Sequence, residues 1–183
     1  MKEQSKGALL KALEARVEKH IGIAVDTFQN LTEEKLLQPA ANGGWSIAQC
    51  MDHLNRYGDY YLPEIEKKLS APKGKNPDTF KGSWLGSYFT RMMEPATGKK
   101  KVKAFKAYIP PAKLDAHAVI AVFINQQEQT LHLLEQARDA DLDRLKIPVS
   151  IAKWISLRLG DVFQFVIAHN ERHVQQAMNN ING

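Results

Sequence analysis

The chain contains 183 residues, of which 44% are hydrophobic and 25% are charged, as in an ordinary globular domain and unlike disordered or fibrous proteins. At roughly 150 residues per domain, this length predicts one domain that covers residues 1–183. The net charge of +5 is unevenly distributed, because residues 67–113 hold 12 of the 25 Lys and Arg residues and only 2 of the 20 Asp and Glu residues. The one cysteine, Cys50, excludes an internal disulfide framework and a CxxC zinc ribbon.

The sequence contains no segment typical of export or membrane insertion. Charges recur every three or four residues over 1–20, which excludes the apolar core of a secretory signal. The longest purely apolar run, Ala118–Ile124, is far shorter than the ~20 residues that span a bilayer. Together with the single cysteine, this pattern predicts a cytoplasmic protein that does not enter a membrane.

The first half of the chain predicts two long helices. Over residues 6–28 apolar residues recur at spacings of three and four, which indicates an amphipathic helix, and Thr32 is placed to cap a short helical turn after it. A second helix is expected to begin at Ser46, because Ser46 and Gln49 have the spacing of a capping box. It continues to about Leu69, with an expected kink at Pro63.

Residues 70–113 form a long crossover that contains five of the eight prolines, and within it residues 84–93 could form a short helix. A third helix is predicted from about 115 to 138, followed by a loop, and a fourth from Ser156 or Asp161 to about Ile181. No strand-like alternation exceeds four residues. Four amphipathic helices with one long crossover predict an all-α four-helix bundle.

Six histidines are the candidate functional residues. His169 and His173, in the sequence HNERH, are four residues apart and therefore lie on one face of the fourth helix, where they could hold a divalent metal ion. Such a pair also occurs by chance in cores and on surfaces. The metalloprotease motif HExxH is excluded, since Asn170 stands where its glutamate would be and Glu171 points away from the pair.

A third ligand would have to come from another helix. His53 is the candidate, because it lies in the capped second helix beside that helix's apolar stripe. His132 shares its face with glutamates and is expected in solvent, while His20 and His117 flank core positions and are weaker candidates.

Two segments resemble a known family. The segment GGWSIAQCMDHL and the segment HNERHVQQ resemble the two signatures of the DinB-like (YfiT-like) superfamily, in the same order and at similar spacing. The resemblance implies an up-down-down-up four-helix bundle with a metal site of His53, His169 and His173, and Trp45 and Gln176 also match. The long basic crossover departs from the family pattern.

Three imidazoles on Zn²⁺, Ni²⁺ or Fe²⁺ leave coordination positions open for water or substrate. A bound divalent metal can activate water or a thiol, and relatives of this family are known for thiol S-transfer. The expected function is therefore a metal-dependent S-transferase or hydrolase that acts on a small molecule, with a low-molecular-weight thiol as a candidate cofactor. The alternative is a non-catalytic binding or interaction module with a structural or vestigial metal site, which would act as a homodimer.

Three other residues near these histidines have open roles. Gln176 could orient a ligand or form an ordinary hydrogen bond in the bundle, and Tyr57 could offer its phenol to a cavity or belong to the core. Cys50 could be a fourth metal ligand, although a buried hydrophobic role is favoured.

The basic crossover has three interpretations. A solvated loop is favoured, and a lid that attracts an anionic thiol or acid is the second. Nucleic-acid contact is the third, suggested by Trp84, Tyr88, Phe89 and Phe105 among the lysines, especially those of 99–103. This third interpretation is disfavoured, because no nucleic-acid-binding signature accompanies the charge.

Overall fold

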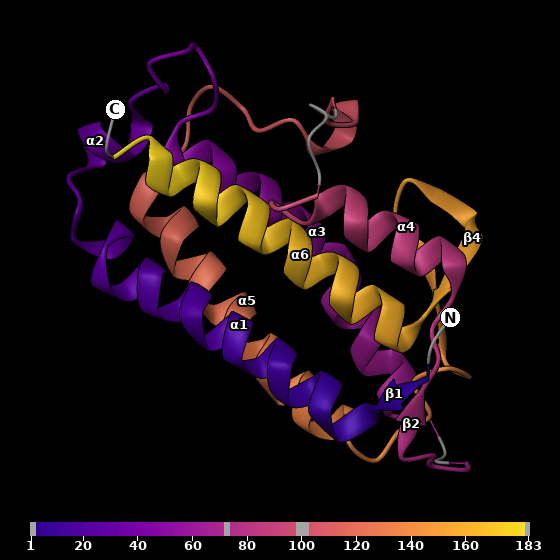
Figure 1. The fold of residues 1–183 in the computed structure, drawn as a ribbon. Coiled ribbons are helices and arrows are strands. Elements are labelled where there is room, and N and C mark those ends of the chain that lie inside the picture. Colours follow the sequence, from indigo (N-terminus) through magenta and orange to yellow (C-terminus); the bar gives the residue numbers. More distant parts are fainter. Residues whose placement is uncertain (1–2, 72–73, 98–102, 182–183) are drawn as a thin grey trace.

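The computed structural model describes residues 3–71, 74–97 and 103–181 of the chain. Six α-helices lie in these ranges (Figure 1), namely α1 (Lys6–Asp26), α2 (Glu33–Leu37), α3 (Ile47–Leu69), α4 (Trp84–Met93), α5 (Ala116–Ala137) and α6 (Leu159–Asn179). The strands are β1 (Gln4–Ser5), β2 (Thr79–Phe80), β3 (Lys146–Val149) and β4 (Ala152–Arg158).

Four long helices, α1, α3, α5 and α6, pack side by side as the predicted four-helix bundle. In Figure 1, α1 and α6 run in one direction and α3 and α5 in the other, which gives the up-down-down-up order. Because α3 and α5 are consecutive long helices with the same direction, the chain must return along the bundle between them. The crossover makes this return and carries α4, which packs against α6.

The helix starts follow local hydrogen bonding. Ser46 Oγ accepts a hydrogen bond from the Gln49 backbone N–H at 3.2 Å, and Gln49 Oε1 accepts one from the Ser46 N–H at 3.1 Å, so the predicted capping box is confirmed. Thr32 caps α2 and Asp115 caps α5 through their side-chain oxygens. The helix α3 continues through Pro63.

The prediction of a loop before the fourth helix is wrong. Its residues form the antiparallel hairpin β3–β4, in which Ile147 pairs with Leu157. The strand β3 has only four residues, and in β4 the alternation of buried and exposed residues is interrupted where Lys153 and Trp154 are both exposed, which conceals the strand signal in the sequence. The register of the pair also shifts between Pro148 and Val149. A second ladder, β1–β2, pairs two residues of each strand and is too short to show an alternation of apolar and polar residues in the sequence.

Two clusters of buried side chains fill the bundle. One lies toward the hairpin and includes Tyr61, Phe80 and Phe163, and the other lies toward the start of α3 and includes Phe28 and Phe123. The three-histidine site described below involves α3 and α6, which both clusters help to fix in place. In the described ranges, no helix is both long enough and apolar enough to cross a membrane.

Candidate metal centre

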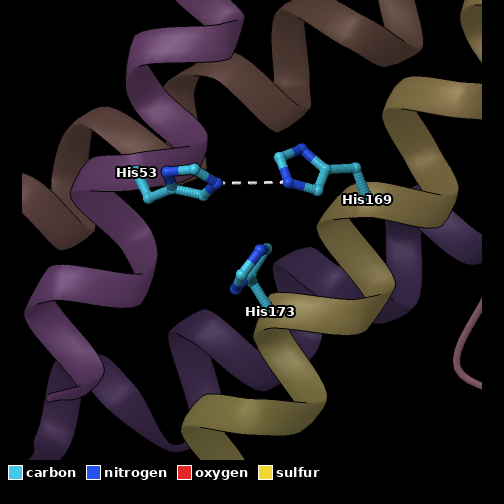
Figure 2. A group of neighbouring side chains, drawn as sticks. All are labelled: His53, His169 and His173. Carbon is cyan, nitrogen blue, oxygen red and sulfur yellow. Dashed lines mark hydrogen bonds between the residues drawn. The ribbon is translucent and has the colours of Figure 1, made fainter. Parts of the chain in front are cut away.

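Three imidazole rings converge between α3 and α6 (Figure 2). His53 comes from α3, and His169 and His173 come from successive turns of α6. Their ring centroids are 4.7 to 5.0 Å apart, and each ring offers a nitrogen that lies within 4.8 Å of the other two. The Nε2 atoms of His53 and His169 are 3.2 Å apart. Two nitrogens that each lie about 2.0–2.1 Å from one ion would be separated by roughly this distance.

Hydrogen bonds hold two of these rings. Nδ1 of His53 lies 2.7 Å from the backbone carbonyl oxygen of Tyr108, and Nδ1 of His173 lies 3.0 Å from Oε1 of Gln176. A carbonyl oxygen only accepts, so Nδ1 carries the proton in both rings and Nε2 keeps its lone pair. This is the arrangement by which proteins orient metal-binding histidines.

The three imidazoles are neutral near pH 7. Burial lowers the pKa of His53, although the hydrogen bond to Tyr108 opposes the shift. Burial, together with the neighbouring His53, lowers the pKa of His173 to about 3. Burial and the other two histidines hold the pKa of His169 well below its ordinary value. The deprotonated form that metal binding requires is therefore already populated.

Aromatic rings surround the cluster. The Trp45 ring lies 4.8 Å from that of His53, and the Tyr57 ring lies 4.6 Å from that of His169, both measured between centroids. Phe165, one helical turn before His169, stacks on its ring at 6.1 Å. Burial raises the pKa of the Tyr57 phenol, so this group stays protonated at neutral pH.

A cavity of about 600 Å³ adjoins the three histidines. Its walls come from α3, α6, the hairpin and the crossover, which contributes Met92, Met93, Lys103 and Phe105. The crossover is thus more than the solvated loop favoured from the sequence, although Trp84 and Tyr88 on α4 are indeed exposed. Lys99–Lys101, on which much of the charge argument rests, lie outside the described residues.

Cys50 lies in the buried core and outside the histidine cluster. It has no exposed surface, and burial raises the pKa of its thiol to about 12. A neutral thiol in the core behaves as a small hydrophobic group, in agreement with the interpretation favoured from the sequence.

Other titratable side chains considered from the sequence lie elsewhere. His20 is fully buried, and its Nε2 lies 2.8 Å from a carboxylate oxygen of Glu171. The same carboxylate accepts from Lys19, and its hydrogen bonds to His20 and then Lys19 lower the pKa of Glu171 to about 2 despite partial burial. Glu171 therefore turns toward α1. His132 lies 2.8 Å from an amide nitrogen on its own helix, and neither it nor His117 belongs to the cluster.

Three features of the site were not identified from the sequence. The Tyr108 carbonyl gives no signal, since every residue has one. The position of Phe165 could have been predicted, because its spacing of four from His169 places both residues on the same helical face. Arg172 lines the cavity and donates from Nη1 to the Met92 carbonyl at 3.2 Å, a contact that depends on where the crossover returns.

Comparisons with known proteins agree with this fold. Among solved structures, YfiT from Bacillus subtilis, described as "a probable metal-dependent hydrolase with an unusual four-helix bundle topology", matches with a TM-score of 0.56 and 16% sequence identity, over 97% of this chain and 86% of that one. At this identity the likeness shows a shared fold. A search of curated proteins finds no match. The model of the DinB superfamily matches residues 16–177, which is most of the sequence, and the chain therefore belongs to the DinB superfamily.

Proposed function

We propose that this protein is a metal-dependent enzyme in which His53, His169 and His173 bind one divalent ion and the adjoining cavity receives a small-molecule substrate. The observation that carries the proposal is the convergence of three neutral imidazoles, two of them held by Nδ1 so that Nε2 faces the shared centre. Zn²⁺, Ni²⁺ and Fe²⁺ all accept such a donor set. YfiT, described as a probable metal-dependent hydrolase, supports the same assignment.

The surrounding residues define what the chain itself would contribute. A bound divalent ion would supply Lewis acidity that lowers the pKa of a water or a thiol. Gln176 and the Tyr108 carbonyl fix the orientation of two rings. Tyr57, a protonated phenol that lines the cavity, can donate a hydrogen bond to an oxygen of the substrate that gains negative charge. Trp45 packs against the rings of His53 and His173, and Phe165 stacks on that of His169.

Thiol S-transfer is favoured over hydrolysis by the composition of the cavity wall. None of the described residues that line the cavity is Asp or Glu, so that lining offers no carboxylate to accept a proton from water. A thiol with a pKa of about 8.5 needs a much smaller shift to ionise near pH 7 than water with a pKa of about 15.7. Attack of a low-molecular-weight thiol on an electrophile therefore requires a smaller pKa shift from this site than attack by water does.

A purely structural metal site fits the geometry less well. Structural zinc sites are closed by four protein ligands, whereas this cluster has three among the described residues and adjoins a cavity of about 600 Å³. Cys50 would be the fourth ligand in a closed site, and it is buried in the core as a neutral thiol.

Metal analysis tests the proposed centre. Protein purified without a nickel column and incubated with Zn²⁺, Ni²⁺ or Fe²⁺ is expected to retain about one ion per chain, and His169→Ala should retain almost none. His132→Ala, which removes an imidazole outside the cluster, and Cys50→Ala should retain the wild-type amount. Wild-type protein that retains none of the three metals would refute the centre.

Activity assays test the chemistry separately. Metal-loaded protein is screened with thiol cofactors plus organic electrophiles, and in parallel with ester and amide substrates. We expect thiol-dependent turnover that His169→Ala abolishes and His132→Ala preserves. Turnover of esters or amides without a thiol would assign hydrolysis instead, and a full metal site without either activity would favour the non-catalytic module.

A further inference from the structure

We infer that the cavity beside the three histidines accepts an organic anion with an apolar body, and that Arg172 and Lys103 select for its negative charge. This inference rests on the proposed function and names the class of substrate that the same site would take. Two properties of the cavity wall carry it: the sign of its charges and the chemistry of the surface between them.

The described residues that line the cavity carry only positive formal charge. Arg172 and Lys103 are the charged residues among them, and none is Asp or Glu. Neutral imidazoles do not offset the charge of a bound divalent ion, so metal loading would make the cavity more positive. A concave site lined by one sign of charge raises the local concentration of ligands of the opposite sign.

Arg172 is placed to act on a ligand at the histidines. It precedes His173 on α6, and its Nη1 atom donates to the Met92 carbonyl at 3.2 Å, which ties it to the end of α4. Arg172 and the three histidines line the same cavity, so the guanidinium charge acts on a ligand held there.

The remaining wall suits an apolar body. Aromatic rings and thioethers line it, from Phe89, Met92, Met93, Phe105 and Phe165. Such side chains bury hydrocarbon surface, and methionines adapt to ligands of different shape. A volume of about 600 Å³ lies in the range of sites for small organic ligands. An anion without an apolar body would leave most of this wall in contact with water.

Isothermal titration calorimetry of metal-free protein tests the charge preference with three probes of equal chain length: octanoate, octylamine and octanol. We expect octanoate to bind at least about tenfold more tightly than the other two, which corresponds to about 1.4 kcal/mol. Arg172→Gln and Lys103→Gln should each weaken octanoate about three- to tenfold and leave octanol unchanged.

Matched variants separate the cavity charges from general surface charge. Arg91→Gln on α4 and Lys106→Gln, three residues after Lys103, remove the same kinds of side chain from outside the lining and should leave octanoate affinity unchanged. Arg172→Lys keeps the charge and should keep the preference for octanoate. Thermal unfolding of each variant confirms folding, and Lys103→Gln, at an exposed position, remains informative if an Arg172 variant does not fold.

Equal affinity for octanoate and octylamine would overturn the inference, as would an effect of Arg91→Gln as large as that of Arg172→Gln. A loss in Arg172→Lys as large as in Arg172→Gln would overturn selection by charge at that residue. Metal content measured on the same samples keeps the two proposals apart: octanoate preference without metal retention refutes the metal centre alone, and metal retention without the preference refutes this inference alone.

Discussion

Gln176 and the backbone of Tyr108 each hold an imidazole by its Nδ1 atom, so a residue outside the proposed ligand set fixes where each free lone pair points. Loss of a partner of this kind typically weakens metal binding by about 10- to 100-fold, because the partner sets both the tautomer and the basicity of the ring. The Gln176 amide is the one of the two that substitution can remove.

We expect Gln176→Leu to weaken zinc binding about 10- to 100-fold, since the His173 ring loses its anchor and can adopt the other tautomer. Competition with a chromophoric chelator measures the dissociation constant. Gln175→Leu is the matched control, because Gln175 also lines the cavity and has no hydrogen bond to the ligands among the described contacts. Equal affinities of the two variants would contradict the role given to Gln176.

The sequence predicts the identity of these residues better than their partners. The spacing of four between His169 and His173 fixes a shared helical face, because helix geometry is regular. The position of His53 beside the other two depends on how two distant helices pack; its place beside the apolar stripe of the capped second helix made it the candidate, and the family resemblance implied the complete set of three. The acceptor from Tyr108 could not be predicted, since it is a backbone group on a segment without periodicity.

At the level of elements, α4 is the part of the cavity wall that is fastened at both ends. The Ser83 hydroxyl before its first turn donates to the Asp161 carboxylate of α6 at 2.6 Å. At its other end, Glu94 accepts from the Arg16 guanidinium of α1 at 2.7 and 3.2 Å. Gly86 allows the close approach of α4 to α6, because a Cβ atom at this position would lie 2.1 Å from the Asp161 side chain.

Gly86→Ala should therefore lower the free energy of unfolding by about 1–3 kcal/mol, as overpacking of a close contact does. Urea denaturation measures the change. Gly22→Ala in α1 is the control, because its Cβ would have no neighbour nearer than 3.9 Å, and this variant should gain about 0.5–1 kcal/mol from helix propensity. A Gly86→Ala protein as stable as Gly22→Ala would show that α4 can shift without cost.

Sequence patterns locate the long helices because each has an apolar stripe, and capping side chains mark the start of α3 at Ser46 and of α5 at Asp115; α6 has no side-chain cap. The ends of the helices differ from the predicted ends by a few residues. The first helix, predicted to reach Phe28, ends at Asp26, and Phe28 belongs to a separate 3₁₀ turn. The hairpin β3–β4 escapes detection because β3 has only four residues, one of them Pro148, and because Lys153 and Trp154 of β4 are both exposed and break its alternation. Tertiary pairing, which sequence periodicity does not report, stabilises these strands.

Across the whole molecule, Asp143 connects the crossover to the base of the hairpin. Its carboxylate accepts from the backbone N–H groups of Lys81 and Gly82 at 2.8 and 3.0 Å and from the Arg158 guanidinium. Burial opposes ionisation of Asp143, but these hydrogen bonds outweigh burial and lower its pKa. The ionised carboxylate thus stabilises the folded state.

This carboxylate makes part of the stability depend on pH. A carboxyl group whose pKa is lower in the folded state contributes fully above its unfolded pKa of about 3.9, and the contribution disappears as the pH falls through the folded value. We expect Asp143→Asn to cost about 1 kcal/mol at pH 7, a value reduced for partial exposure, and progressively less below pH 4. Urea unfolding at pH 7 and pH 3 measures both. A cost that is the same at both pH values would contradict this account.

The shared direction of α3 and α5 has a consequence for how such proteins can diverge. A helix of 23 residues is about 35 Å long, and the polypeptide must retrace that distance before α5 can begin. In a bundle whose successive helices run in opposite directions, tight turns connect the helices. The walls of any interior cavity then come from the same helices that stabilise the fold. Here the retracing segment borders the interior on one flank, whereas the three imidazoles come from the long helices α3 and α6, so much of this segment can change while the carbonyl that holds His53 is kept. Descendants of one ancestral scaffold could therefore acquire new ligands by exchanging this segment alone.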